Sequence, residues 1–320
     1  MAVTALRNQP GASGVTVRLA VDGFLSSPRC ANPNTRRAYA SALDRLADAL
    51  GPDRPLATVA GEELAAALER LWGRAKPATW NRNRAAFASW LAWCARNSHA
   101  APALPSAAER RADPADETKA LTRPQVERLL TRRDVPLREK TLWRMLYETA
   151  ARAGEVLALD IEDLDLAGRR APVRSKGGAT QWVYWGSGTA HLLPGLLRLP
   201  DGTVRTRGPL FLSERRPGPA RRPAAADLCP HTGRARLGYD RARILLDRYT
   251  RPSGGRPGWD LHQLRHSAAT HLGEAGTALQ LIMAKTRQHS PRTAMRYVKP
   301  GAEAVAEVTE LLDVTPRRRG

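Results

Sequence analysis

The chain has 320 residues, of which 42% are apolar and 26% charged, so it is long enough for two globular domains and too apolar for one long disordered chain. No apolar run approaches the roughly 20 residues of a membrane span, and the N-terminus has no secretory signal pattern, so we expect a soluble, cytoplasmic protein without a membrane partner. The formal net charge of +20 favours nucleic acid as the partner, and we expect double-stranded DNA. An arginine-rich coding bias adds to this charge but does not explain the shortage of acidic residues.

The three cysteines argue against two further classes of protein. Cys30, Cys94 and Cys229 are odd in number and widely separated, which fits neither a disulfide framework nor a metal knuckle. The sequence also has no cluster of Asp, Glu, His or Cys with metal-ligand spacing. We therefore expect reduced, structural cysteines, no metal and no cofactor.

Apolar residues at helical spacing predict three helices in the first hundred residues. The first runs from Thr35 to Leu50, the second is expected after a cap at Thr58, and the third after a cap at Thr79. Arginines beside the apolar stripe of the first helix and near the start of the third suit contacts with DNA phosphates, while a solvated surface is an equal alternative for any one of them. These candidate DNA-binding residues are Arg36, Arg37, Arg82 and Arg84.

Composition divides the chain into five segments. Residues 1–15 are expected to form a flexible N-terminus and 16–98 a helical DNA-binding domain. The segment 99–119 contains three prolines and few large apolar residues, which predicts a linker. Residues 120–314 are expected to form a second domain, followed by a basic tail at 315–320.

The second domain is expected to be helical with a small inserted sheet. Thr122 caps a helix, a further helix runs from Arg138 to Ala150, and helices resume from Leu261. Three short strands are expected between them, at 164–170, 171–175 and 181–185. The predicted fold class is therefore mainly α with a small antiparallel β-sheet.

The stretch from His262 to Tyr297 holds groups whose chemistry suits cleavage of a phosphodiester without a metal. Such a reaction needs a nucleophile, positive donors for the non-bridging oxygens, a proton acceptor and a proton donor for the leaving oxygen. Tyr297 offers the nucleophile, and arginine suits the phosphate because its planar guanidinium binds two oxygens and stays charged. Lys176 lies in a tight Ser-Lys-Gly-Gly turn and can give its proton to a leaving group.

In this order the residues resemble the tyrosine recombinases, also called the phage-integrase family, over nearly the whole chain. The segment around Arg152, Thr-Ala-Ala-Arg-Ala-Gly-Glu-Val-Leu, is similar to the one that carries the family's first catalytic arginine. His262-Gln-Leu-Arg265 is similar to the second box. By the same resemblance Lys176 falls on the family's β-hairpin lysine, and Tyr297 falls on its nucleophile.

The resemblance also implies an architecture and an activity. It implies a core-binding (SAM-like) domain over 16–98 and an α+β catalytic domain over 120–314. It further implies cleavage and rejoining of DNA strands through a 3′-phosphotyrosyl link, without metal or nucleotide cofactor, by a homotetramer on DNA. We expect the apolar face of a helix at 301–312 to dock into a neighbouring protomer, with packing on its own domain as the alternative.

One position departs from the family's pattern. The family has His or Trp nine residues before the tyrosine, where this chain has Gln288, and the nearest histidine, His289, lies one residue closer. We favour Gln288 for this third box, because the spacing from Thr293 to Tyr297 is then kept without a gap. His289 is the alternative.

Three functions remain open: a site-specific recombinase, a topoisomerase IB-like enzyme, and a DNA-binding protein that has lost catalysis. The N-terminal helical domain and the C-terminal helix favour the first. The divergent third box favours an integrase of a mobile element over a housekeeping resolvase. Residues outside the motifs are assigned to structure or half-buried packing, namely His266, His271, Tyr39, Tyr147, Tyr184, Tyr239 and Tyr249.

Overall fold

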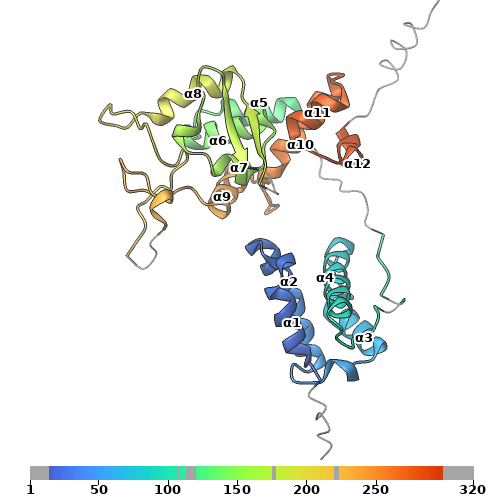
Figure 1. Ribbon diagram of the computed structural model, residues 1–320. Helices are drawn as coiled ribbons and strands as arrows, with labels where there is room; N and C mark the ends of the chain where they lie inside the picture. The colour runs from blue at the N-terminus through green and yellow to red at the C-terminus, as the bar shows by residue number, and fades with distance from the viewer. Residues whose placement is uncertain are drawn as a thin grey trace, which may run out of the picture. The chain divides into compact units, whose positions relative to one another are not determined.

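The structure, a computed structural model, describes residues 14–104, 106, 108–112, 120–174, 178–219 and 223–297. The chain divides into two compact units, 1–117 and 118–320. The predicted fold class is confirmed: the described residues of both units are mainly helical, and those of the second include a small antiparallel sheet (Figure 1). None of the described helices is long and apolar enough to cross a membrane.

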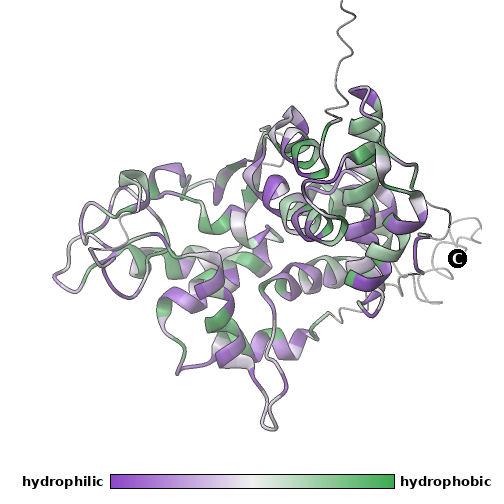
Figure 2. Ribbon diagram, turned by 90° about the horizontal axis from the view of Figure 1, so that it is seen from below, coloured by the Kyte–Doolittle hydropathy of each residue, from purple (hydrophilic) through white to green (hydrophobic). Residues whose placement is uncertain are grey.

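The first unit is a bundle of amphipathic helices. Figure 2 shows that helices of the structure carry both hydrophobic and hydrophilic positions, as expected of helices that bury one face. Phe24, Phe87 and Trp90 are almost completely buried in its core, and Phe24 packs edge-on against Trp93 with ring centroids 6.1 Å apart. In chain order its elements are α1 (Val17–Ser26), η1 (Pro28–Cys30), α2 (Pro33–Leu50), η2 (Leu56–Thr58), α3 (Gly61–Trp72) and α4 (Pro77–Arg96).

Two helices of this unit begin at other residues than the sequence predicted. Helix α3 begins at Gly61 rather than directly after Thr58, and α4 begins at Pro77 rather than after Thr79. The Thr58 hydroxyl donates instead to the carbonyl of Pro55 at 2.8 Å. Proline suits the first position of a helix, because the N–H that it lacks has no partner there in any case.

The described part of 99–119 packs against the first unit, where the composition had predicted a linker. The indole N–H of Trp80 donates to the carbonyl of Glu109 at 2.8 Å. The side-chain amide of Asn81 pairs with the backbone of Arg111 in both directions, at 2.8 and 3.0 Å. The Arg111 guanidinium also lies 3.8 Å from the centroid of the Trp80 ring. These contacts hold the segment on α4.

The second unit contains helices with a small sheet inserted between them in the chain. As predicted, Thr122 caps its first helix, with the hydroxyl accepting the N–H of Gln125. In chain order its elements are α5 (Arg123–Thr131), α6 (Leu137–Thr149), α7 (Ala153–Leu157), η3 (Ile161–Asp163), β1 (Arg170–Arg174), β2 (Thr180–Tyr184), α8 (Ser187–Leu197), η4 (Ala225–Asp227), α9 (Tyr239–Thr250), α10 (Leu261–Glu274), α11 (Leu279–Thr286), α12 (Pro291–Ala294) and η5 (Met295–Tyr297).

The sheet has two strands in the described residues, where the sequence predicted three. Strands β1 and β2 pair antiparallel over their full lengths. The segment 164–170, which was expected to be the first strand, contributes a single bridge between Asp165 and Arg170. The Asp165 carboxylate accepts the N–H of Gly168 at 2.8 Å and the side chain of Arg170 at 2.9 Å. These bonds close a tight turn, so the prediction of a third strand here is wrong.

Helices α6 and α10 form the centre of the second unit. Trp143 and Met145 of α6 are fully buried. Helix α6 packs against α8 and α10, and α10 also packs against α5, α9, α11 and η5 (Figure 1). Arg152 lies between α6 and α7, and Tyr297 ends η5, so α10 brings its own residues close to both.

Candidate active site

The first turns of α10 run from solvent into the core. Asp260 caps the helix, and its carboxylate accepts the N–H of His262 at 2.7 Å. Spacings of three and four residues place Arg265 and His266 on the same side of the helix as His262. His262 is exposed, whereas Arg265 is 2% and His266 9% exposed. The helix therefore presents His262 to solvent and encloses Arg265 and His266.

Arg265 joins α10 to the ends of α6 and α11. Its guanidinium donates to the carbonyls of Ala150 and Thr286. Burial, together with the positive charges of Arg152 and Arg287, lowers the pKa of Arg265 to about 10. Arg265 is still charged at neutral pH. Its charge and those of Arg152 and Arg287 make this region positive, which favours an anion such as a DNA phosphate.

A single carboxylate organises the arginines around it. Glu155 accepts the side chain of Arg152 at 2.8 Å through one oxygen and the side chain of Arg287 at 2.7 Å through the other. It also accepts the backbone N–H of Arg152 at 2.9 Å. Burial raises the pKa of Glu155, but these hydrogen bonds and the charge of Arg287 outweigh it, so the pKa lies below its ordinary value. The Arg152 side chain remains 48% exposed and open to a ligand.

Arg287 is a member of the site that no sequence motif revealed. It ends α11 with a φ of 53°, in the left-handed region that non-glycine residues seldom adopt. Its side chain is buried, and its Nε has no hydrogen-bond partner among the described residues. The sequence signal was weak, because nothing in the local pattern shows that the residue before Gln288 turns inward.

The hydroxyl of Tyr297 lies inside the protein. Tyr297 is 6% exposed, and its oxygen is 2.9 Å from Nδ1 of His266. The His266 ring packs edge-on against the ring of His262, with centroids 4.4 Å apart. The sequence assigned His266 to structure, and its contact with the candidate nucleophile was missed. The available signal was the spacing of four residues from His262, which places the two rings on one helix face.

The two candidates for the third box differ in their surroundings. The Gln288 side chain is partly enclosed, and its Oε1 is buried without a hydrogen-bond partner among the described residues. His289 is exposed. Lys176 lies outside the described residues, so its position relative to the other groups is not described. Another lysine, Lys285, donates to the carbonyl of Tyr184 at 2.8 Å, and burial lowers its pKa.

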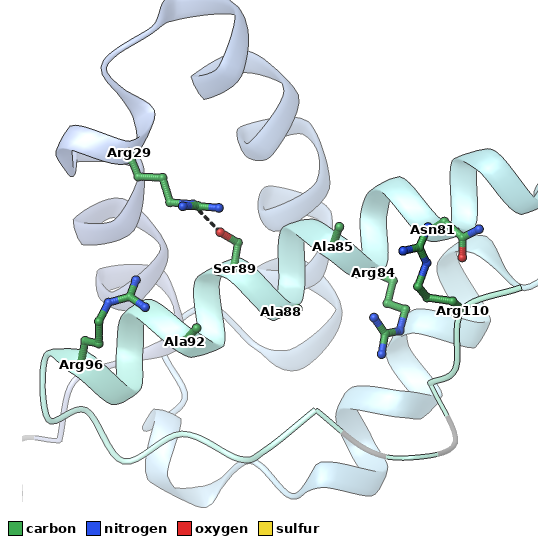
Figure 3. A pocket seen from close by; sticks show the side chains of 9 residues that line it. All are labelled: Arg29, Asn81, Arg84, Ala85, Ala88, Ser89, Ala92, Arg96 and Arg110. Atoms are coloured by element: carbon green, nitrogen blue, oxygen red, sulfur yellow. Dashed lines mark hydrogen bonds between the residues drawn. The ribbon is translucent and has the colours of Figure 1, made fainter. Parts of the chain in front are cut away.

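A second cluster of positive charge lies in the first unit, along α4. Figure 3 shows this hollow, which we call the basic hollow, with arginine side chains around a floor of small residues. Its volume is about 440 Å³, and no carboxylate lines it. The lining residues are Arg29, Asn81, Arg84, Ala85, Ala88, Ser89, Ala92, Arg96 and Arg110.

The predicted DNA-binding arginines divide between the basic hollow and the helix surface. Arg84 lines the hollow, where its Nε donates to the carbonyl of Ala108. Arg36, Arg37 and Arg82 are exposed on α2 and α4. Within the described residues, no group of His, Cys, Asp and Glu is arranged to hold a metal ion.

Replacing Glu155 with glutamine should leave Arg287 buried without its carboxylate. We expect the free energy of unfolding at neutral pH to fall by about 3–5 kcal/mol. Because the pKa of Glu155 is lowered in the folded protein, its stabilising effect is complete above the ordinary glutamate pKa of about 4.3 and is lost as the pH falls through the folded pKa. The stabilities of wild type and Glu155→Gln, measured by urea denaturation, should therefore converge on acidification.

The exposed pair of Arg54 and Glu63 provides a matched control, since it has the same chemistry on the surface. Glu63→Gln should change stability little. A gap between wild type and Glu155→Gln that stays constant as the pH is lowered would contradict the role given to the ion pair.

Comparison with known proteins identifies relatives of this architecture. Residues 119–303 match the Phage integrase family. The chain is 30% identical over 198 residues to the tyrosine recombinase XerD of Mycobacterium leprae (strain TN), an alignment that covers 59% of each protein. It is 29% identical over 277 residues to the tyrosine recombinase XerC of Mycobacterium sp. (strain JLS), covering 82% of this chain and 87% of XerC. The match to XerD thus spans less than two thirds of the length of that relative.

Solved structures share the fold at lower identity. The Tn1549 transposon integrase in complex with a circular intermediate DNA superposes with a TM-score of 0.70 at 14% identity, covering 94% of this chain and 100% of that one. A lambda integrase dimer bound to a COC′ core site superposes with a TM-score of 0.65 at 18% identity, covering 89% and 77%. The family match extends over more than half of the sequence, and the chain belongs to the phage integrase family.

Proposed function

We propose that this protein is a tyrosine-type site-specific recombinase that cleaves and rejoins DNA through a 3′-phosphotyrosyl link to Tyr297. The observation that carries the proposal is the packing of Tyr297, at the end of η5, against α10, the helix that bears His262 and Arg265. Arg152 lies close enough to Arg265 for their charges to interact. Membership of the phage integrase family supports the same reaction.

The arrangement supports a direct transesterification. Arg152 and Arg265 hold the non-bridging oxygens of the scissile phosphate and stabilise the charge that develops there, together with the exposed His262. The phenol oxygen of Tyr297 attacks phosphorus, and the 5′ oxygen leaves with a proton supplied by Lys176. Because one phosphodiester replaces another, the link can be reversed onto a second strand without a nucleotide cofactor.

We assign the third box to Gln288. Its buried Oε1 is without a partner among the described residues, which favours a side chain kept for a ligand. The Gln288 amide carries a donor and an acceptor, and a rotation by 180° exchanges their positions. In the rotated orientation the amide N–H takes the place of Oε1 and can donate to a phosphate oxygen.

The first unit supplies binding to the DNA backbone in this proposal. The four arginines of the basic hollow present charge without a neighbouring carboxylate in the lining, and Arg36, Arg37 and Arg82 add exposed charge on α2 and α4. Such contacts give affinity and position but carry no sequence information. The DNA present in the Tn1549 and lambda integrase structures agrees with this assignment.

The assembly in this proposal is a homotetramer on DNA, formed through the helix expected at 301–312, which lies outside the described residues. The biological role that we favour is integration of a mobile element. The likeness in fold to a transposon integrase agrees with that role.

The proposal is tested by trapping the covalent intermediate. Nicked suicide duplexes taken from the DNA that flanks the protein's own gene should give a protein–DNA adduct that resists denaturing electrophoresis. Tyr297→Phe should abolish the adduct, because the variant has no nucleophilic oxygen, and should leave DNA affinity unchanged. Absence of an adduct from the wild-type protein, or its persistence in Tyr297→Phe, would reject the proposed function.

The assignment of the third box is tested by two single substitutions. Gln288→Ala should slow cleavage of the suicide duplex more than His289→Ala, because Gln288 is enclosed and His289 is exposed. The loss expected from removing one phosphate donor is about 10²–10³-fold in rate. The reverse ranking would place His289 in the site.

The role of the basic hollow is tested by the salt dependence of DNA binding. The double variant Arg29→Ala/Arg96→Ala should bind duplex DNA more weakly. The negative slope of the logarithm of the association constant against the logarithm of the salt concentration should become shallower by about 2, since each phosphate contact contributes roughly −0.9 to it. Arg70→Ala, on α3 and outside the hollow, should leave the slope unchanged. An unaltered slope in the double variant would exclude the hollow from the interface.

A further inference from the structure

Helix α10 makes two histidine–tyrosine contacts of the same kind. Nδ1 of His271 is 2.8 Å from the hydroxyl of Tyr147, and Nδ1 of His266 is 2.9 Å from the hydroxyl of Tyr297. His271 also contacts the carbonyl of Leu121 through Nε2, at 2.9 Å, so that pair joins α10 to α6 and to the chain before α5. The pair of His266 instead contains the group proposed to attack DNA.

We propose that His266 is the proton acceptor for Tyr297, and that His262 contacts the phosphate. The inference rests on the proposed function, since it assigns a role within that reaction. Two different tasks fall to two histidines on one helix face, one enclosed beside the phenol and one exposed toward the DNA.

The geometry supports a direct transfer. The phenol oxygen and the ring nitrogen are already at hydrogen-bond distance, so no side chain has to move before the proton can pass. Nδ1 of His266 accepts this hydrogen bond when its ring is neutral and carries its proton on Nε2. Contact with the perpendicular ring of His262, at a centroid distance of 4.4 Å, fixes the plane of the acceptor.

Burial adds a second argument. His266 and Tyr297 are 9% and 6% exposed, so bulk water does not compete well for the proton of the phenol. His262 lies one helical turn nearer the start of α10 and is exposed, where an incoming phosphate reaches it. The guanidinium of Arg265 lies close enough to the phenol for a favourable charge interaction, which stabilises the tyrosinate as it forms.

The proposed step balances in protons and electrons. The O–H bond of Tyr297 breaks, its proton moves to Nδ1 of His266, and the oxygen's electron pair forms the bond to phosphorus. The bond from phosphorus to the 5′ oxygen breaks, and that oxygen leaves with the electron pair and takes a proton from the general acid. In the rejoining reaction the imidazolium of His266 returns its proton to the departing phenol oxygen.

The experiment measures single-turnover cleavage of the nicked duplex on which the wild-type protein forms its adduct. His266→Ala should cleave about 10²–10⁴-fold more slowly with unchanged DNA affinity, and added imidazole should restore part of the rate by filling the space left behind. His266→Gln, which keeps a polar side chain but accepts no proton at neutral pH, should be as slow as His266→Ala. A duplex whose 5′ bridging oxygen is replaced by sulfur should not restore the cleavage rate of either variant. Sulfur leaves without a general acid, so this duplex restores only variants that lack the general acid.

His271→Ala is the matched control, since it removes the other histidine of a tyrosine pair from the same helix. It should lower thermal stability without an imidazole-dependent cleavage rate. Cleavage by folded His266→Gln within a few-fold of wild type would overturn the inference and leave the proposed function intact. A slow His266→Ala that imidazole does not rescue would assign the residue to structure, and absence of an adduct with wild-type protein would overturn both proposals.

Discussion

The candidate site depends on the buried carboxylate of Glu155, which lies between Arg152 and Arg287. Without it, the guanidinium groups around Arg265 would face one another in a region with little water, and a buried charge without its partner is strongly destabilising. With it, an ion pair joins Glu155 of α7 to Arg287 at the end of α11, and a second ion pair with Glu155 holds the exposed side chain of Arg152. The remaining positive charge is suited to a phosphate.

Helix α10 serves the core and the site at once. Leu261 and Leu264 are buried in the hydrophobic core, while Arg265 bonds the carbonyls of Ala150 and Thr286. The same turns carry His266, whose Nδ1 is 2.9 Å from the hydroxyl of Tyr297. A shift of α10 would therefore disturb packing, phosphate binding and the nucleophile together, which explains how residues more than a hundred positions apart in sequence are held in one arrangement.

The sequence predicted those features that depend on local pattern and motif order. It identified Arg152, Arg265 and Tyr297, which the structure brings together, and the cap at Thr122. It did not predict α1, and it placed a third strand where hydrogen bonds to Asp165 close a turn. Its greatest omissions are Arg287 and the contact of His266 with Tyr297. A left-handed residue that turns inward, and a ring nitrogen that meets a hydroxyl 31 residues away, depend on tertiary packing that no local pattern reports.

The proposed chemistry requires that Tyr297 is the residue that becomes joined to DNA. The direct measurement is peptide mapping by mass spectrometry of the covalent adduct after digestion of protein and DNA. We expect the nucleotide remnant on the peptide that contains Tyr297, linked through a 3′ phosphate. A remnant on a different tyrosine, such as the exposed Tyr184 or Tyr239, or a 5′ phosphate linkage, would contradict the account.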